Sequence, residues 1–262
     1  MLCARLRPAD MDASAGSVKH LQRIVAQIRQ AWPEVKITIR GDSGFCREPL
    51  MGWCEADGVD YVLGLAQNTR LKAMIATEQE QARQEFERTK QAARVFTDLE
   101  YRTLESWSRE RRVVAKAEHL AKGANPRFVV TSLTSKDRAA KPLYEEDYCG
   151  RGEMENRIKE QQLHLVADRT RASTMRANQV RLFCSSIAYV LLEALRRLGL
   201  AGTELAEAQC LTIRLKLLKI GALVRVTVRK VWVKMSSGCP DADVFRQVHA
   251  NLSRLHPVML RC

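Results

Sequence analysis

The chain has 262 residues, of which 46% are apolar, 28% are charged and only 7 are proline. This composition excludes a disordered chain, a collagen-like chain and a disulfide-rich miniprotein, and the length predicts one large domain or a core with an inserted subdomain. Lysine and arginine total 43 against 30 aspartates and glutamates, a formal net charge of +13. Such an excess favours a polyanionic partner, nucleic acid or an anionic membrane surface, although many basic proteins carry their lysines as solvated surface.

Membrane insertion, secretion and zinc binding are not expected. The longest apolar stretch, Leu182 to Leu192, is shorter than the roughly 20 residues of a spanning helix and is predicted to be a core helix. The first residues, MLCARLRPADMD, have no apolar segment typical of a signal peptide, so we expect a cytoplasmic protein. The eight cysteines are scattered without a CxxC pair, which predicts reduced thiols and no zinc site.

The first quarter of the chain has the pattern of an α/β core. Apolar residues recur at three- and four-residue intervals over 17–31, which predicts an amphipathic helix. In residues 35–40, β-branched residues alternate with others, and this pattern ends at Gly41-Asp42-Ser43-Gly44. A strand is therefore expected to lead into a tight turn. A short helix is predicted over 48–56, and the apolar run 59–66 is typical of a strand buried in a parallel sheet.

The rest of the chain predicts an insertion followed by helices. Residues 69–93 indicate an exposed helix, and 94–104, 111–118 and 127–134 indicate strands of a small antiparallel unit. Helices are expected from residue 145 and over 177–198, and a strand over 223–233. The predicted organisation is therefore a partial core (1–67), a β-rich insertion (68–140), a helical core segment (141–200) and a C-terminal extension (201–262).

Asp42 is the first candidate for chemistry. It stands where a predicted strand ends, which is the edge at which open α/β sheets present functional side chains. The alternative is that an aspartate between Gly41 and Ser43 only forms the turn through a local hydrogen bond. The dipeptide chemistry alone favours this structural interpretation.

A second constellation lies around residue 155. On one continuous helix, residues spaced by three or four share a face, and here these are Tyr148, Arg151, Glu155, Lys159 and Gln162. Such a stripe is either solvated surface or a site facing the sheet, and periodicity does not choose between them. An aspartate on a strand and a glutamate on a helix would suit Mg²⁺, which takes carboxylate oxygens as ligands.

Three separated motifs together resemble one family. GDSGF (41–45), CEADGVDYVLGLAQN (54–68) and YCGRGEMENRIKEQ (148–161) look like the catalytic region of bacterial insertion-sequence transposases of the DDE superfamily. The similarity covers nearly the whole chain. Tyr148, Arg151 and Glu155 fit the spacing of the family's glutamate helix, whereas its lysine position holds Gln162 here, with Lys159 one turn earlier as the candidate replacement.

The resemblance implies a fold, a chemistry and a partner. It implies a ribonuclease-H-like α/β core with a β-rich insertion, in which Asp42 is the second aspartate of the acidic triad and Glu155 its glutamate. Two Mg²⁺ (or Mn²⁺) ions held by the triad would activate water, and then a DNA 3′-hydroxyl, for attack on phosphodiesters. Tyr148, Arg151 and Lys159 would contact phosphates of double-stranded DNA, at the element's ends and the target, in a homodimer associated with the nucleoid.

The first aspartate of the triad is the main departure. In the family it stands on the first core strand, but only 41 residues precede Asp42 here and they predict a loop and one helix. Asp10 and Asp12 are not assigned to that role. We therefore expect an N-terminally truncated transposase that is inactive or impaired alone, with a non-catalytic DNA-binding remnant as the alternative. A metal-dependent nuclease on a related fold is a third, less favoured hypothesis.

Basic residues gather after the glutamate helix. Arg169, Arg171 and Arg176, followed by Arg181, have no acidic residue between them. For an arbitrary protein such a stretch is most often solvated surface. The net positive charge and the resemblance favour contacts with DNA phosphates instead.

Overall fold

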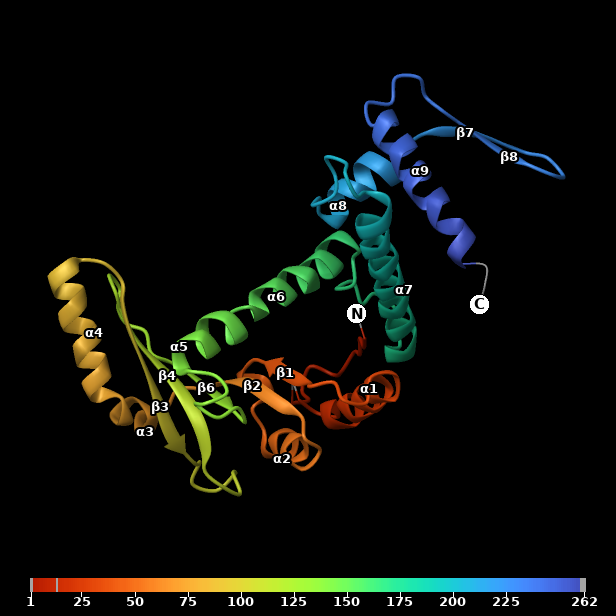
Figure 1. Ribbon diagram of the computed structural model, residues 1–262. Coiled ribbons are helices and arrows are strands. Elements are labelled where there is room, and N and C mark those ends of the chain that lie inside the picture. Colours follow the sequence, from red (N-terminus) through yellow and green to blue (C-terminus); the bar gives the residue numbers. More distant parts are fainter. Residues whose placement is uncertain (1, 13, 260–262) are drawn as a thin grey trace. The chain divides into compact units, whose positions relative to one another are not determined.

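The computed structural model describes residues 2–12 and 14–259, with the side chains of 151 and 256–259 left out (Figure 1). The chain forms two compact units. Of the described residues, the first unit holds those from 8 to 154, and the second holds residues 2–7 together with 155–259.

The first unit contains the elements predicted for the core and the insertion. In chain order these are α1 (Ser17–Ala31), β1 (Thr38–Gly41), α2 (Glu48–Ala56), β2 (Asp60–Leu65), α3 (Thr69–Met74), α4 (Ala76–Thr89), β3 (Ala93–Tyr101), β4 (Arg111–Leu120), β5 (Gly123–Ala124), β6 (Arg127–Thr131) and α5 (Ala140–Pro142). The helix predicted over 69–93 is divided at Ile75, whose backbone leaves the helical region (φ −111°, ψ 20°) and whose side chain is buried. The helix predicted as continuous and exposed is therefore interrupted at a residue whose side chain is buried in the core.

Five strands lie in the order β1-β2-β6-β4-β3, and the short β5 pairs with β4. β1 and β2 are parallel, as predicted, whereas β6, β4 and β3 pair antiparallel. The predicted α/β class is thus confirmed as a mixed α/β fold. The antiparallel strands do not form a sheet of their own: β6 pairs directly with β2, so they extend the parallel pair into one sheet.

Alternating side chains bury both faces of this sheet. On β2, Tyr61 and Leu63 pack into a large cluster with α1, α2 and α3 on one face. Val62 points to the other face and packs against Leu143 and Tyr144. The second pair belongs to a π-helical turn, Leu143–Tyr148, which we call the tyrosine segment. A strand covered on both sides must be apolar throughout, which explains the uninterrupted apolar run at residues 61–63.

The second unit is mainly helical. Its elements are α6 (Arg151–Lys159, which begins in the first unit), a π-helical turn (Glu160–His164), α7 (Met175–Ala194), a second π-helical turn (Leu195–Gly199), α8 (Cys210–Ile213), a third π-helical turn (Arg214–Leu218), β7 (Ala222–Val226), β8 (Val231–Met235) and α9 (Ala242–Met259). Its core gathers Tyr189, Leu192, Leu200, Ile213 and Val248.

One apolar face of α7, the helix predicted to lie in the core, is exposed. Phe183 is 50% exposed, Ile187 61% and Leu191 64%, whereas Tyr189 and Leu192 are buried. An apolar groove on the exposed side is lined by Phe183, Ile187 and Leu191 of this helix and by the segment Leu2, Cys3 and Ala4. The prediction of a core helix was therefore wrong for this face, because periodicity shows that a helix has an apolar face but not what covers it. No helix among the described residues is long and apolar enough to cross a membrane.

The strand predicted over 223–233 is a hairpin. β7 and β8 pair antiparallel from Ala222 opposite Met235 to Val226 opposite Val231. The turn is closed by the Thr227 amide, which donates to the Lys230 carbonyl at 2.8 Å. This turn has no glycine, asparagine or proline, the residues that would have indicated it in the sequence.

Candidate functional site

Asp42 lies directly after β1, at the carboxyl end of the parallel strand pair. Its backbone is extended (φ −82°, ψ −175°) and its Oδ1 accepts a hydrogen bond from the Gly44 amide at 2.9 Å, which starts the turn Ser43–Phe45. The predicted local hydrogen bond is therefore present. The side chain is nevertheless exposed, and a carboxylate with two oxygens has capacity for further ligands.

A cavity of about 260 Å³, with both polar and apolar walls, opens next to Asp42. Because β1 and β2 are parallel, their carboxyl ends meet here, and because β6 is antiparallel to β2 (Leu65 opposite Phe128), β6 begins at the same edge. The lining residues are Ser43, Gly64, Leu65, Ala66, Gln67, Pro126, Arg127, Phe128 and Tyr148. Gln67 and Arg127 were not predicted as site residues. Gln67 follows β2 directly, whereas Arg127 reaches this edge only because β6 pairs with β2.

The Tyr148 side chain, from the end of the tyrosine segment, lies at this edge of the sheet. A Cβ atom added at Gly64 would lie 2.6 Å from the Tyr148 hydroxyl, 3.1 Å from the Ser43 amide nitrogen and 3.4 Å from the Asp42 carbonyl carbon. Glycine at position 64 thus lets the phenol approach the turn that carries Asp42.

Two contacts hold the tyrosine segment in place, one from β1 and one from the loop after β6. The Arg40 guanidinium, on β1, donates to the Asp147 carbonyl at 2.9 Å. Arg138 forms an ion pair with the Asp147 carboxylate at 2.6 Å. Asp147, the residue before Tyr148, is therefore held through both its backbone carbonyl and its side chain, which restricts the position of Tyr148.

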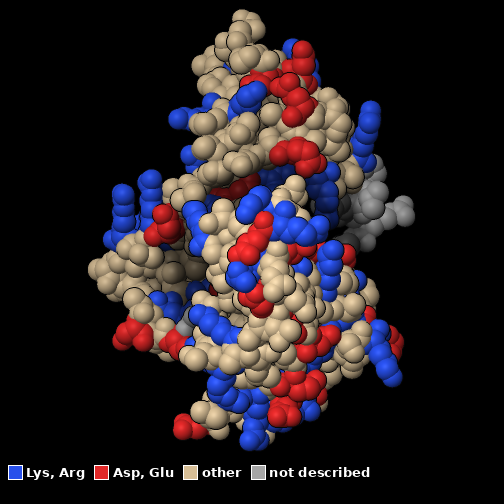
Figure 2. Space-filling model, turned by 90° about the vertical axis from the view of Figure 1, so that its left-hand side faces the viewer, with Lys and Arg blue, Asp and Glu red and all other residues tan. Residues whose placement is uncertain are grey.

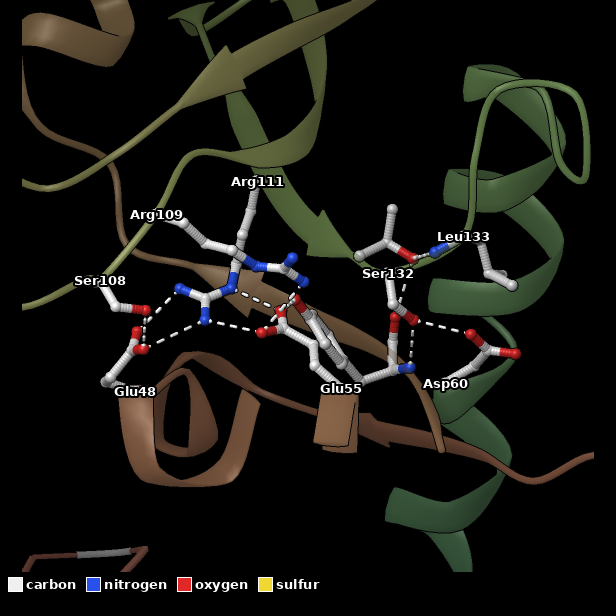
Figure 3. A network of polar contacts seen from close by, with 10 residues as sticks. Glu48, Glu55, Asp60, Ser108, Arg109, Arg111, Ser132 and Leu133 are labelled. Carbon is white, nitrogen blue, oxygen red and sulfur yellow. Dashed lines mark hydrogen bonds and ion pairs between the residues drawn. The ribbon is translucent and has the colours of Figure 1, made fainter. Parts of the chain in front are cut away.

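A buried arginine fastens α2, which follows the Asp42 turn, to the sheet (Figure 3). Arg111 at the start of β4 is 4% exposed and pairs with Glu48 and Glu55 of α2, each at 2.7 Å. Tyr61 of β2 donates to Glu55 at 2.7 Å. Burial acts to raise the pKa of Glu55, but hydrogen bonds from Arg111, Tyr61 and Arg109 outweigh it and lower the pKa to about 2.

Glu155 lies on α6 and is exposed. The boundary between the two units falls between Met154 and Glu155, so Asp42 and Glu155 belong to different units. Their convergence on one metal site stays a prediction. Lys159 is exposed one turn further along α6, and Arg151 begins this helix with its side chain outside the described part.

The expected helix around these residues is not continuous. The tyrosine segment ends at Tyr148, two turn residues follow, and α6 starts at residue 151. The shared face predicted for five residues assumed an uninterrupted α-helix, which the structure does not have. Within α6, Glu155 and Lys159 lie four residues apart and therefore share a face of the helix.

The predicted arginine stretch lies exposed before and at the start of α7. Arg169, Arg171 and Arg176 are exposed and form no ion pair with other described residues. Figure 2 shows a face of the protein on which basic and acidic side chains are interspersed. On α4, for example, Arg83 pairs with Glu80 at 2.6 Å and Arg88 with Glu85 at 2.6 Å. Unlike these paired arginines, the arginine stretch retains its positive charge uncompensated.

One group of metal-ligating side chains lies close together in the described part: Glu160, Glu193 and Cys210. Arg196 occupies the space between them: it contacts Glu160 at 3.1 Å and the Cys210 Sγ at 3.6 Å, and it forms an ion pair with Glu193. Burial acts to raise the pKa of Glu160, but the Cys210 amide and Arg196 lower it. The guanidinium already supplies the positive charge, so this group is a structural ion-pair network.

Comparison with known proteins places the chain in a family. A comparison with curated proteins gave no match. The family profile described as transposase DDE domain group 1 matches residues 1–257, nearly the full length. The resemblance in the three sequence motifs is thereby confirmed. The chain belongs to the DDE-domain transposase family, group 1.

Proposed function

We propose that this protein is a DNA transposase that cleaves and joins DNA strands with the help of divalent metal ions held by Asp42 and Glu155. The observation that carries the proposal is the exposed Asp42 carboxylate at the carboxyl end of two parallel strands, beside Tyr148, in a chain matched by the DDE family over residues 1–257. DDE transposases act on DNA and generally use a divalent metal. We propose a ribonuclease-H-like core as the scaffold, with 68–140 as its insertion.

The two carboxylates fit a hard cation. Asp42 and Glu155 are both exposed and offer oxygen ligands, the donors that Mg²⁺ and Mn²⁺ prefer. When bound, the metal would supply Lewis-acid activation of a water or 3′-hydroxyl nucleophile. The turn bond from Gly44 to Asp42 Oδ1 orients this carboxylate before any ligand arrives.

One tyrosine and several basic residues around the proposed site would bind the DNA backbone. Tyr148 and Arg127 line the cavity beside Asp42, where a phosphate could accept from the phenol and the guanidinium. Arg151 and Lys159 lie on the helix of Glu155, as the resemblance implies for phosphate contacts.

The arginine stretch supports the same partner. Arg176 stands in the first turn of α7, where a cation is disfavoured by the helix dipole unless an anion is nearby. We propose that Arg169, Arg171 and Arg176 contact DNA phosphates, and that the protein acts as a homodimer on element ends and target DNA.

A non-catalytic DNA-binding protein is the second candidate function. It is favoured by one observation: the arginine stretch is exposed and forms no ion pair with other described residues, so it could bind DNA phosphates whether or not the acidic site is active. The chain would then occupy DNA without cutting it.

The deciding experiment is cleavage and strand transfer by purified protein on duplex DNA that carries the ends of the mobile element encoding it, with Mg²⁺ or Mn²⁺. Asp42→Asn keeps an oxygen for the Gly44 bond, and Glu155→Gln keeps the side-chain shape. Each should lower activity by more than about 100-fold, while Glu153→Gln, also exposed on α6, should retain it. Unchanged activity in both variants would refute the assignment. DNA binding by a wild-type protein that does not cut would establish the second candidate.

A further inference from the structure

The hairpin β7–β8, residues 222–235, is an isolated two-stranded ribbon. It forms a sheet of its own with no third strand among the described residues (Figure 1). Every residue of the two strands is exposed except Met235, which is half-buried. Two strands without a covering layer are marginally stable, so an exposed ribbon of this kind is expected to serve contacts outside the fold.

The register gives the ribbon two different faces. The pairs 222/235, 224/233 and 226/231 place only alanine, valine and methionine on one face. On the other face Leu223 is opposite Lys234 and Arg225 is opposite Trp232. The turn carries Arg229 and Lys230, and Lys230 lies over Trp232 of this second face. We call the second face together with the turn the basic face.

The charge of the basic face is uncompensated. Residues 208–240 contain no aspartate or glutamate. Arg225, Arg229, Lys230 and Lys234 are exposed and form no ion pair with any other described residue. The Lys230 ammonium instead lies 5.7 Å from the centre of the Trp232 ring, a cation–π contact that leaves the charge available to an anion.

We propose that the basic face of the β7–β8 ribbon is a DNA-binding element separate from the acidic site, which holds backbone phosphates through Arg225, Arg229, Lys230 and Lys234. This inference rests on the proposed function for its partner, duplex DNA. A two-stranded ribbon fits the major groove, which is about 12 Å wide and flanked by phosphates on both sides. Phosphate contacts would position the protein without specifying sequence.

Charge favours DNA over a second copy of the chain as the occupant. The apolar face could pair with the same face of another ribbon, but four cations on the basic face and turn would then remain without a counter-charge. Duplex DNA compensates all four and releases its counterions on binding. Self-association is therefore the alternative that the experiment must separate.

The first test is the salt dependence of binding to a fluorescein-labelled duplex of mixed sequence, measured by anisotropy with Ca²⁺ in place of Mg²⁺ so that no cleavage intervenes. The test variant carries Arg225→Gln, Arg229→Gln, Lys230→Gln and Lys234→Gln. At about 0.9 per phosphate contact, four lost contacts should reduce the slope of log K against log salt by about 3 to 4 and weaken binding at least about tenfold.

A matched variant controls for net charge. Lys72, Arg102, Lys122 and Lys136 are exposed in the first unit and form no ion pair with described residues. Their replacement by glutamine removes the same charge and should leave the slope almost unchanged. Equal slopes for the ribbon variant and wild type, or an equal loss in both variants, would overturn the inference.

Lysine labelling of the wild-type protein covers the case in which the ribbon variant fails to fold. Duplex DNA should protect Lys230 and Lys234 from acylation but leave Lys136 reactive, as read by peptide mass mapping. Protection without DNA at rising protein concentration, with a matching dimer in sedimentation, would point to self-association and overturn the DNA assignment. The outcome is independent of catalysis: Asp42→Asn should abolish cleavage without changing this protection.

Discussion

Replacing Arg111 by methionine removes the guanidinium that joins α2 to β4 while keeping the length of the side chain. Arg111 is 4% exposed and contacts two carboxylates, Glu48 and Glu55. Without the guanidinium, both carboxylates keep their positions near the sheet but lose their main partner. Breaking a buried ion pair by removing one member typically costs about 3 to 5 kcal/mol.

The pKa of Glu55 gives an independent magnitude. Burial raises this pKa, but hydrogen bonding, first from Arg111, lowers it from 4.5 to about 2. At 1.36 kcal/mol for each pKa unit, Arg111, Tyr61 and Arg109 together stabilise the ionised Glu55 by about 3 kcal/mol after the opposing effect of burial, and Arg111 is the largest of the three. We therefore expect Arg111→Met to lose about 3 to 4 kcal/mol of unfolding free energy at pH 7.

The sign of the pH dependence follows from the lowered pKa. A carboxyl group with a depressed folded-state pKa contributes fully above its ordinary value, 4.5, and the contribution disappears as the pH falls towards about 2. In the variant, acid instead neutralises two carboxylates that have lost the guanidinium of Arg111. The stability difference between wild type and variant should therefore be largest at pH 7 and smaller at about pH 3.

Urea unfolding followed by circular dichroism at both pH values measures this difference. Arg109→Met is the control, because Arg109 pairs with the same Glu55 from a side chain that is 61% exposed and should cost at most about 1 kcal/mol. A loss below about 1 kcal/mol for Arg111→Met, or a loss that is the same at both pH values, would refute this reasoning.

Two further predictions concern close contacts in the first unit. Gly64→Ala would place a Cβ 2.6 Å from the Tyr148 hydroxyl and should lower the free energy of unfolding, measured by calorimetry, by about 1 to 3 kcal/mol. Adding Tyr148→Phe, which removes the hydroxyl, should restore part of this stability. A neutral effect of Gly64→Ala would contradict the close packing at this edge. Asn68→Ala removes the helix cap that accepts from the Leu71 amide at 2.9 Å, and should lower the free energy of unfolding in urea by about 1 kcal/mol. Asn68→Asp keeps an accepting oxygen and should retain most of the wild-type stability. Equal losses in both variants would argue against the cap.

The sequence predicted the local elements of the first unit closely. α1 and α2 have the predicted bounds, β2 lies within the predicted strand, and β1 starts three residues later and ends one residue later than predicted. Each is specified by a periodic pattern of neighbouring residues and by a stop signal such as Gly41, so no distant contact is needed to predict it. The three motifs also sufficed to indicate the family, and Asp42 was located correctly at the end of its strand.

What the sequence alone determined was therefore local: which segments form helices and strands, and which residue types could bind metal or DNA. Tertiary structure decided how they combine. Pairing of β2 with β6 brought Arg127 to the cavity beside Asp42, and the exposed face of α7 and the hairpin at 222–235 departed from their predicted states. The physical reason is that strand pairing and burial depend on surfaces far apart in the chain, whereas periodicity reports only on neighbours.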